Sequence, residues 1–381
     1  MKKIGILGST GSVGSEALEI INEYKNKFEL VFISGNLNAS KLIEQTSTYN
    51  PQFICLVDKQ NISEVKNKTN NVKVLSGYEG LLDLCDIDVD IVLNAISGYK
   101  GLSLSMKIIE NGIDLALANK ESIVQAGSIL MDKAKNNKVN IFPVDSEHSA
   151  LWQCLIGENK NNIDKLILTG SGGPFRLIPK EKLYYVKKEE ALNHPNWSMG
   201  NKITIDSATM MNKGFELIEA HWLFDIPYEK IDIVIHPESI IHSMIKFIDG
   251  SIKAQLSIPT MRIPIQFALT YPERYENKNI EFDFIKNNQF TFEKVDYEKF
   301  RCIELAYQSG KSGGTYPTVL NVSNDLAVDL YLKNKINFGD IQMLIEEALD
   351  SHSNIQNPTL SDIKDTIVLT EQYINNFKVP S

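Results

Sequence analysis

The stretch KKIGILGSTGSVGSEAL, residues 2–18, decides the fold class of the first part of this chain. A short apolar run precedes three glycines, Gly8, Gly11 and Gly14, and an amphipathic segment follows them. This order predicts a strand, a tight turn and a helix, because glycine lets the backbone turn sharply. Such a backbone can approach a pyrophosphate, whose charge is favourable at the N-terminus of a helix. The spacing is looser than G-x-G-x-x-G, but its place after a first strand favours dinucleotide binding over a plain turn.

The same alternation of apolar runs and amphipathic segments continues to about residue 145. The predicted strands cover residues 2–9, 28–35, 52–58, 90–96, 113–119 and 139–145. Strands that alternate with helices predict a parallel sheet covered by helices on its faces. We therefore predict an α/β protein whose residues 1–145 form a Rossmann-type domain that binds a dinucleotide.

The pattern changes after residue 145. Strand-like runs at residues 164–172, 202–208, 232–239, 243–249 and 251–257 accompany a helical pattern at 212–224, which predicts a second, central α+β domain over residues 146–270. The polar segment 271–296 has no steady period and is interpreted as a linker. Helical periodicity over residues 297–381 predicts a C-terminal helical domain, in which Thr359 and Asp362 have the spacing of a helix cap.

The composition is that of a folded globular protein with a net negative charge. The 381 residues include 43% hydrophobic and 23% charged residues, and the net charge is −9. A negative chain argues against a surface for nucleic acid or anionic membranes, and no apolar run is long enough to cross a membrane. The four cysteines show no zinc spacing, and the first apolar run is too short for a signal peptide, so we expect reduced thiols and a cytoplasmic protein.

The end of the second predicted strand indicates which dinucleotide is bound. An NAD site normally has a carboxylate there, which accepts a hydrogen bond from the ribose 2′-hydroxyl. Here the strand ends in Ser34, Gly35, Asn36 and Asn38, with no carboxylate. A 2′-phosphate would not be repelled at this position, and we therefore predict NADPH, although Lys41 is the only nearby cation.

The stretch PVDSEHSALWQ, residues 143–153, has two interpretations. Asp145, Glu147 and His148 follow a predicted strand closely, so they could hold a cation. Acidic residues are also ordinary in the first turn of a helix, where they face the positive end of its dipole. From the local stretch alone, the helix start is the preferred interpretation.

A second stretch, TIDSATMMNKGFELIEAHW at residues 204–222, supplies matching chemistry. Ser207, Asn212 and Lys213 offer a hydroxyl, an amide and a cation for a phosphate, and Glu216 offers a further carboxylate. With Asp145 and Glu147 it would complete an oxygen-only set that suits Mg²⁺ or Mn²⁺ rather than zinc. The alternative is a capped amphipathic helix with solvated charges, and the residue types alone leave both open.

Three further segments carry suitable side chains. LTGSGGPFR, residues 168–176, places Ser171 in a glycine-rich turn, and LANKES, residues 117–122, places Lys120 at the carboxyl end of a predicted strand. In NHPNWSMG, residues 193–200, His194 and Trp197 lie in a loop that could form a lid near residues 191–201 and exclude water. Taken singly, the turn that carries Ser171 could be a simple β-turn, and in the third segment a Trp that anchors the loop to the core would be the preferred interpretation.

Together, GSTGSVG, LANKES, PVDSEH, LTGSGGPF, HPNWSMG, DSATMMNKGFE and GGTYPTVLN strongly resemble the 1-deoxy-D-xylulose 5-phosphate reductoisomerase family. The motifs occur in family order from the first strand to the C-terminal helices. The resemblance implies metal-dependent rearrangement of 1-deoxy-D-xylulose 5-phosphate, followed by reduction with NADPH to 2-C-methyl-D-erythritol 4-phosphate for isoprenoid synthesis. It also implies a homodimer with a small phosphorylated sugar as its substrate.

The resemblance assigns roles to individual residues. The implied metal ligands are Asp145, Glu147 and Glu216, which with Lys120 and His194 form the implied catalytic group. The implied substrate-binding residues are Lys120, Ser146, Glu147, Ser171, His194, Trp197, Ser207, Asn212, Lys213 and Glu216. The implied NADPH-binding residues are Thr10, Gly11, Ser12, Val13, Gly35, Asn36, Asn38, Asn119, Glu121 and Gly200.

The chain departs from the family pattern at three places that carry no predicted ligand. It has Glu238 in HPES where HPQS is usual, Thr260 where Asp usually precedes MR, and VSND at residues 322–325 where AANE is usual. Two other functions remain as alternatives: an NADP-dependent semialdehyde or homoserine-type dehydrogenase, and a non-catalytic NADP-sensing module. The semialdehyde reaction needs an activated cysteine, whereas Cys154 lies in an apolar helical stretch.

Overall fold

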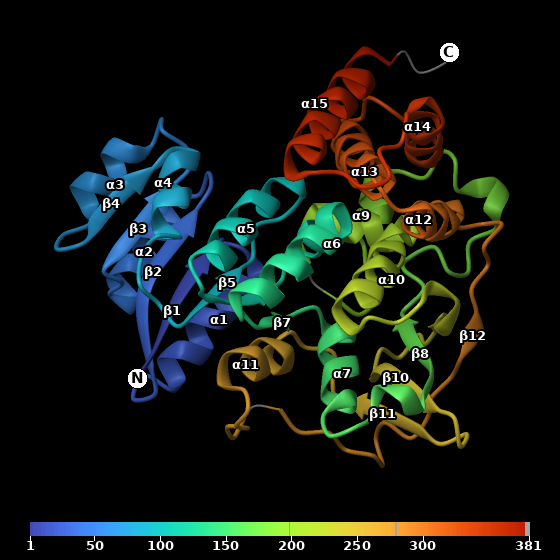
Figure 1. The fold of residues 1–381 in the computed structure, drawn as a ribbon, viewed down its shortest axis with the longest axis horizontal. Helices are drawn as coiled ribbons and strands as arrows, with labels where there is room; N and C mark the ends of the chain where they lie inside the picture. Colours follow the sequence, from blue (N-terminus) through green and yellow to red (C-terminus); the bar gives the residue numbers. More distant parts are fainter. Residues whose placement is uncertain (198, 279, 378–381) are drawn as a thin grey trace. The chain divides into compact units, whose positions relative to one another are not determined.

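The computed structural model describes residues 1–197, 199–278 and 280–377 (Figure 1). The chain divides into two compact units. Unit 1 comprises residues 1–119, 130–149 and 260–276, and unit 2 comprises residues 120–129, 150–259 and 277–381. Within the described residues, no helix is both long enough and apolar enough to cross a membrane.

Unit 1 is built on a seven-stranded, wholly parallel sheet with the strand order β4-β3-β2-β1-β5-β6-β7. The strands are β1 (Lys2–Leu7), β2 (Phe28–Gly35), β3 (Phe53–Leu56), β4 (Lys73–Ser76), β5 (Ile91–Asn94), β6 (Asp114–Leu117) and β7 (Ile141–Pro143). The order reverses between β1 and β5, and ligands bind at such a switch point in sheets of this kind. The predicted Rossmann-type arrangement is confirmed.

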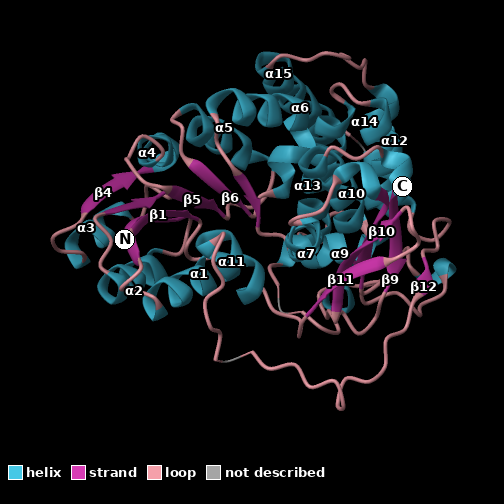
Figure 2. Cartoon of the chain, turned by 60° about the horizontal axis from the view of Figure 1, so that its bottom comes forward, coloured by secondary structure: helices cyan, strands magenta, loops and turns pink. Residues whose placement is uncertain are grey.

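Helices cover both faces of this sheet (Figure 2). They are α1 (Ser12–Glu23), α2 (Ala39–Tyr49), α3 (Ile62–Lys68), α4 (Gly77–Leu84) and α5 (Leu102–Glu110), joined by α11 (Arg262–Thr270), which packs against α1. Six of the seven strands coincide with predicted ones. The exception, β4, is a short edge strand whose side chains are half-buried or exposed. An edge strand does not need the apolar run of the inner strands, so the sequence pattern did not predict it.

Two helices carry the chain between the units. In α6 (Lys120–Asn137) the backbone departs from helical angles at Ala126, with φ −141° and ψ 38°. Residues 120–129 of this helix belong to unit 2 and its later residues to unit 1. The second helix, α7 (Ser146–Leu155), begins in unit 1 and ends in unit 2.

Unit 2 contains a five-stranded mixed sheet and a group of helices. The sheet has the order β11-β10-β8-β9-β12, formed by β8 (Ile163–Gly170), β9 (Ile231–Ile235), β10 (Ile241–Phe247), β11 (Ile252–Leu256) and β12 (Glu293–Lys294). The helices are α8 (Lys188–Ala191), α9 (Asn201–Thr209), α10 (Met211–Phe224), α12 (Arg301–Ser312), α13 (Tyr316–Leu332), α14 (Phe338–Ser351) and α15 (Leu360–Asn376). The buried helix α10 packs on β8, β9 and α12, and so lies at the centre of the unit.

The prediction of a strand at residues 202–208 is wrong, because this segment forms α9. Ile203 and Ile205 alternate as strand residues do, but Lys202 and Asp206 form an ion pair at helical i,i+4 spacing. The remaining four predicted strands of unit 2 coincide with β8, β9, β10 and β11. The predicted cap at Thr359 is also confirmed, since Thr359 and Asp362 form a reciprocal capping box at the start of α15.

Candidate active site

The turn after β1 depends on two glycines for its shape. Gly8 has φ +86°, and a Cβ there would lie 2.7 Å from the carbonyl oxygen of Ala95, which follows β5. A Cβ on Gly14 would lie 2.4 Å from the carbonyl oxygen of Gly8. Both distances are far below a normal contact, so the first turn of α1 can approach the end of β1 only with glycine at these positions.

The N-terminus of α1 is suited to an anion. Gly11 caps the helix without a side-chain hydrogen bond, and the first turn contains no acidic residue. The first backbone N–H groups of a helix have no partner within it and carry a partial positive charge. Thr10, Gly11, Ser12 and Val13, all predicted to bind NADPH, surround this helix start.

The end of β2 lies beside the same turn. A Cβ on Gly35 would lie 2.9 Å from Cγ2 of Thr10, so these two predicted cofactor residues are neighbours. Asn36 is exposed, whereas the Oδ1 atom of Asn38 accepts the N–H of Lys41 at 3.0 Å and caps α2. Asn38 therefore retains only its amide NH₂ group as a donor to a ligand.

Asn119 joins the loops that follow β5 and β6. Its Nδ2 atom donates to the carbonyl oxygens of Ile96 at 2.7 Å and Gly98 at 2.8 Å. A Cβ on Gly101 would lie 2.3 Å from its Oδ1 atom, so the side chain fits closely against that backbone. Asn119 thus shapes the edge of the sheet where the predicted cofactor residues lie.

Asp145 and Glu147 lie at the start of α7 and serve the helix as well. Asp145 directly precedes the helix, and its Oδ1 atom accepts the N–H of Glu147 at 3.2 Å. Ser146 Oγ donates to Glu147 Oε2 at 2.6 Å. A carboxylate oxygen of Asp145 and one of Glu147 lie within 4.8 Å of each other. The helix-start interpretation is therefore correct, and it leaves two carboxylates close enough for one cation to contact both.

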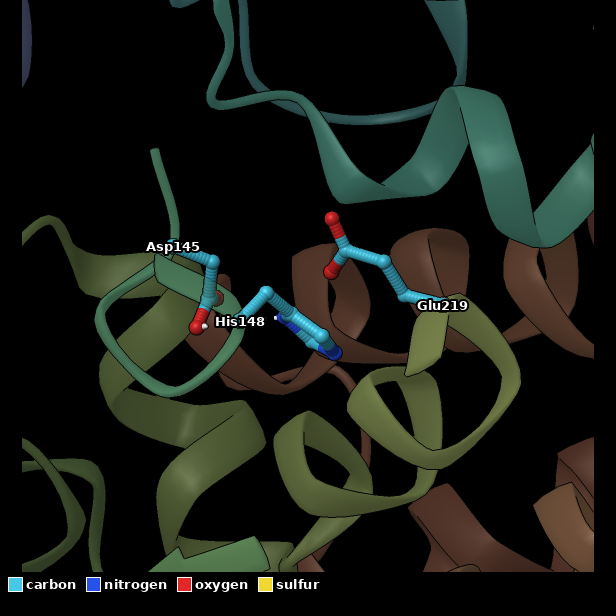
Figure 3. Close-up of side chains that lie close together, drawn as sticks. All are labelled: Asp145, His148 and Glu219. Atoms are coloured by element: carbon cyan, nitrogen blue, oxygen red, sulfur yellow. Dashed lines mark ion pairs between the residues drawn. The ribbon is translucent and has the colours of Figure 1, made fainter. Parts of the chain in front are cut away.

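His148 lies one helical turn after Asp145 (Figure 3). Its Nδ1 atom is 3.5 Å from Asp145 Oδ1, and its side chain is fully buried. The imidazole is thus close enough to the Asp145 carboxylate to restrain its orientation. Figure 3 also labels Glu219, a buried residue one turn beyond Glu216 on α10.

Glu216 lies within unit 2 at the centre of a buried polar cluster. Its Oε1 atom accepts the amide of Asn212 at 2.6 Å and lies 3.3 Å from Lys120 Nζ. Lys120 Nζ also donates to Asn212 Oδ1 at 2.9 Å, and Lys213 pairs with Glu216 Oε2. The Glu216 side chain is 0% exposed, and a buried carboxylate requires partners of this kind. Four predicted site residues are therefore in contact.

Lys213 is fixed by β8. Its Nζ atom donates to the carbonyl oxygen of Thr169 at 2.6 Å. A Cβ on Gly170 would lie 2.9 Å from Lys213 Cε, so glycine at this position leaves room for the lysine stem. The Lys213 side chain is nearly fully buried. A lysine is rarely buried unless a carboxylate and further acceptors surround its ammonium group, as Glu216 and Thr169 do here. The predicted phosphate-binding lysine is thus held in one place by the protein.

Ser171 and His194 are in direct contact. Ser171 Oγ lies 3.1 Å from His194 Nε2 and accepts the N–H of Gly173. His194 Nδ1 accepts the backbone N–H groups of Asn196 and Trp197, both at 3.1 Å. Because Nδ1 is an acceptor, the proton of the neutral ring is on Nε2, which then donates to Ser171. Burial lowers the pKa of His194, which favours this neutral form.

Three further predicted residues are Ser207, Trp197 and Gly200. Gly173 has φ +66°, and a Cβ there would lie 2.5 Å from the carbonyl oxygen of Ser207, so the turn that bears Ser171 packs directly on α9. The Trp197 ring lies 6.3 Å from that of His242. Gly200 caps α9, and its carbonyl oxygen accepts the Thr204 hydroxyl at 2.9 Å. Ser198, which falls within the predicted lid, lies outside the described residues.

Lys202 is not among the site residues predicted from the sequence, yet its ammonium group lies among three carboxylates. Lys202 Nζ is 2.6 Å from Asp206, 2.9 Å from Asp325 and 3.2 Å from Glu121. The i,i+4 spacing of Lys202 and Asp206 was the one available signal, and the strand interpretation of this segment concealed it. Glu121, predicted to bind NADPH, is thus held by an ion pair.

The three departures from the family pattern have identifiable surroundings. Glu238 accepts the Thr291 hydroxyl at 2.6 Å and lies 3.1 Å from His236, so it holds the segment before β12. Thr260 Oγ1 accepts the N–H of Arg262 at 3.2 Å, at the start of α11. In the third departure, VSND at residues 322–325, Asp325 forms an ion pair with Lys202.

The cysteines do not support a thioester reaction. All four are free and buried. Burial raises the pKa of Cys154 to about 11, so the thiol is protonated at neutral pH and a poor nucleophile. The structure thus argues against the semialdehyde alternative.

Comparison with known proteins agrees with the resemblance. Three family models match the chain: 1-deoxy-D-xylulose 5-phosphate reductoisomerase at residues 4–127, the C-terminal domain of the same name at 141–224, and DXP reductoisomerase C-terminal domain at 256–371. Curated relatives named 1-deoxy-D-xylulose 5-phosphate reductoisomerase include one from Caldanaerobacter subterraneus, 51% identical and aligned over 95% of this chain and 96% of its own. Another, from Clostridium kluyveri, is 47% identical over 99% of both chains.

Solved structures agree as well. The Zymomonas mobilis reductoisomerase in complex with NADPH is 36% identical, with a TM-score of 0.90 over 99% of this chain and 100% of its own. A DOX-P reductoisomerase in complex with NADPH, fosmidomycin and magnesium is also 36% identical, with a TM-score of 0.92 over 98% of this chain and 96% of its own. This chain belongs to the 1-deoxy-D-xylulose 5-phosphate reductoisomerase family.

Proposed function

We propose that this protein converts 1-deoxy-D-xylulose 5-phosphate to 2-C-methyl-D-erythritol 4-phosphate, using NADPH and a divalent cation, on the way to isoprenoids. The observation that carries the proposal is the buried cluster of Lys120, Asn212, Lys213 and Glu216, four residues that match the family motifs and contact one another. Family membership over nearly the whole chain supports the same activity. It argues against the two alternative functions, a dehydrogenase and a non-catalytic NADP-sensing module.

The donor atoms suit the cation. We propose that Asp145, Glu147 and Glu216 bind Mg²⁺ or Mn²⁺, which prefer oxygen ligands. Asp145 and Glu147 present oxygens within 4.8 Å of each other, and Glu216 is an acceptor already surrounded by donors. When bound, the cation would polarise the substrate ketone and stabilise the negative charge that develops during rearrangement. Lys120, next to Glu216 Oε1, would place a further positive charge beside that oxygen.

The phosphate would be held by side chains that the fold fixes beforehand. We assign this role to Ser171, Ser207, Asn212 and Lys213. The Lys213 ammonium is immobilised by Thr169, and Gly173 brings the turn of Ser171 against α9. The neutral His194 ring donates to Ser171 Oγ, which directs the Ser171 hydroxyl proton away from the ring and toward a ligand. Binding energy from the phosphate would then orient the reacting carbons.

The cofactor residues suit a dinucleotide phosphate. The turn at Gly8, the uncapped start of α1 and the carboxylate-free end of β2 favour a pyrophosphate and a 2′-phosphate. When bound, NADPH would supply the hydride for the reduction step. The rearrangement is an isomerisation without loss of electrons, and the reduction consumes one hydride and one proton to give the alcohol and NADP⁺. Trp197, in the predicted lid over residues 191–201, would exclude water from this step.

We further propose a homodimer in the cytoplasm, and a division into a cofactor domain, a central catalytic domain, a linker and a C-terminal helical domain. The resemblance to the family supports both. Sedimentation of the purified protein tests the dimer, and a monomer at all concentrations would contradict it.

The activity is tested with purified protein, NADPH, Mg²⁺ and the sugar phosphate. Loss of NADPH absorbance should require all three components, and mass spectrometry should detect the methylerythritol phosphate. Aspartate semialdehyde and homoserine with NADP⁺ are the control substrates. Turnover of either control without turnover of the sugar phosphate would overturn the proposal.

A further inference from the structure

We infer that Lys202 is a positioning residue for this reaction, holding Glu121 and with it the first turn of α6 that carries Lys120. The inference rests on the proposed roles of Glu121 toward NADPH and Lys120 toward the substrate. Lys202 Nζ lies 3.2 Å from Glu121 Oε1, and Glu121 directly follows Lys120 in the chain.

Lys202 contacts all three helices of unit 2 that carry proposed site residues. It belongs to α9, which carries Ser207, and its ammonium group reaches Glu121 in α6. The same group lies 5.0 Å from the ring centroid of Phe215 in α10, the neighbour of Glu216. A cation over an aromatic face is attracted to it, so one lysine connects the helices that bear Lys120, Ser207 and Glu216.

The pocket around Lys202 is rich in negative charge. Asp206, Asp325 and Glu121 contribute three carboxylates against one ammonium, and their side chains are 2%, 11% and 10% exposed. Burial alone would lower the pKa of Lys202, but the three carboxylates raise it well above its ordinary value, so the ammonium group remains charged. Without that charge, Glu121 would face two buried acids at close range.

Asp206 has a second partner on another helix besides Lys202. Asp206 also accepts the Asn324 amide at 2.9 Å, which fixes it against α13. Glu121 lies in the first turn of α6, a helix whose cap residue Asn119 makes no capping hydrogen bond with its side chain. Asn119 instead holds the loop after β5. The ion pair with Lys202 therefore restrains the first turn of α6 where side-chain capping does not.

The test separates positioning from net charge. Lys202→Met removes one positive charge from the pocket, whereas Lys202→Met combined with Asp325→Asn restores the original net charge but still lacks the ion pair with Glu121. Lys202→Arg keeps both the charge and the donors, and Asp325→Asn alone keeps the Lys202–Glu121 pair. The Kd of NADPH is measured for each protein by fluorescence titration without substrate, and folding is checked by circular dichroism.

We expect both proteins that carry Lys202→Met to bind NADPH about tenfold more weakly, the loss expected for one charge-assisted contact. Lys202→Arg and Asp325→Asn should stay within about twofold of the wild type. Recovery of affinity in the double variant would show that only net charge matters and would overturn the inference. Wild-type affinity in both proteins that carry Lys202→Met would also overturn the inference. A double variant that does not fold would do the same, because Lys202 would then serve the fold as a whole. A wild-type protein that does not bind NADPH would instead contradict the proposed function.

Discussion

The Nδ1 atom of His194 accepts the backbone N–H of Trp197 at 3.1 Å, so a neutral imidazole closes the turn that carries the proposed lid tryptophan. Burial lowers the pKa of His194. The unfolded chain therefore takes up a proton on this residue at a higher pH than the folded chain does. The stabilisation that the neutral His194 ring gives to the folded state is complete above the ordinary histidine pKa of about 6.5. It is lost as the pH falls through the lower pKa that His194 has in the folded state.

NMR titration of the His194 ring should thus give a pKa below the ordinary value. A variant with His194→Gln should show a smaller loss of thermal stability between neutral and mildly acidic pH than the wild type. His352, whose pKa burial also lowers, is the matched control, since its replacement should leave the His194 titration unchanged. A His194 pKa at or above the ordinary value would contradict the assignment of the proton to Nε2.

Glu216→Gln should abolish turnover while NADPH binding stays nearly unchanged. Loss of a ligand should lower kcat by more than the roughly 10- to 100-fold typical of residues that merely support metal ligands. Steady-state kinetics against Mg²⁺ concentration, together with NADPH titration, measure both quantities. Glu346→Gln, which removes a partly exposed carboxylate that pairs with Arg301, is the control. Wild-type activity of the Glu216 variant at limiting Mg²⁺ would show that Glu216 is not a ligand.

Lys213→Met should mainly raise KM for the sugar phosphate, because it removes a charge-assisted contact worth roughly 1.5–3 kcal/mol, or about 10- to 150-fold. Methionine keeps most of the buried stem, whereas alanine would also create a cavity beside Gly170. The same variant should bind NADPH normally. An unchanged KM in a folded protein would exclude Lys213 from phosphate binding.

Gly14→Ala and Gly11→Ala should have different effects although they lie three residues apart. A Cβ on Gly14 would lie 2.4 Å from the Gly8 carbonyl oxygen, so Gly14→Ala should destabilise unit 1 by about 1–3 kcal/mol, the typical range for overpacking. A Cβ on Gly11 would lie 3.4 Å from the same atom, at the edge of ordinary contact. Gly11→Ala should therefore fold normally and weaken NADPH binding only. Thermal unfolding and NADPH titration separate the two, and equal stability of both variants would contradict the geometry.

Thiol reagents should not inactivate the enzyme at neutral pH. Burial raises the pKa of Cys154 to about 11 and of Cys55 to about 12, so the reactive thiolate is scarce and shielded. Cys154→Ser should change kcat by less than about twofold, since no proposed step uses the thiol. Rapid inactivation by iodoacetamide, prevented by the serine variant, would revive a thioester mechanism.

By itself, the sequence determined the elements whose information is local. The apolar runs gave six of the seven parallel strands of unit 1, and the glycines at residues 8, 11 and 14 gave the turn after β1. The long family motifs identified residues that the structure brings into contact, such as Lys120, Asn212 and Glu216. The strands and the turn could be predicted because periodicity and turn residues act within about ten positions of the chain.

Only the tertiary structure decided the features that depend on distant partners. The segment at residues 202–208 alternates like a strand, yet it is a helix because its polar side chains meet partners in α6 and α13. The half-exposed edge strand β4 is supported by its neighbour β3 rather than by its own apolar content. Lys202 collects carboxylates from positions 121, 206 and 325, which no local pattern connects. Packing brings such groups together from segments far apart in the chain, and burial then makes their pairing essential.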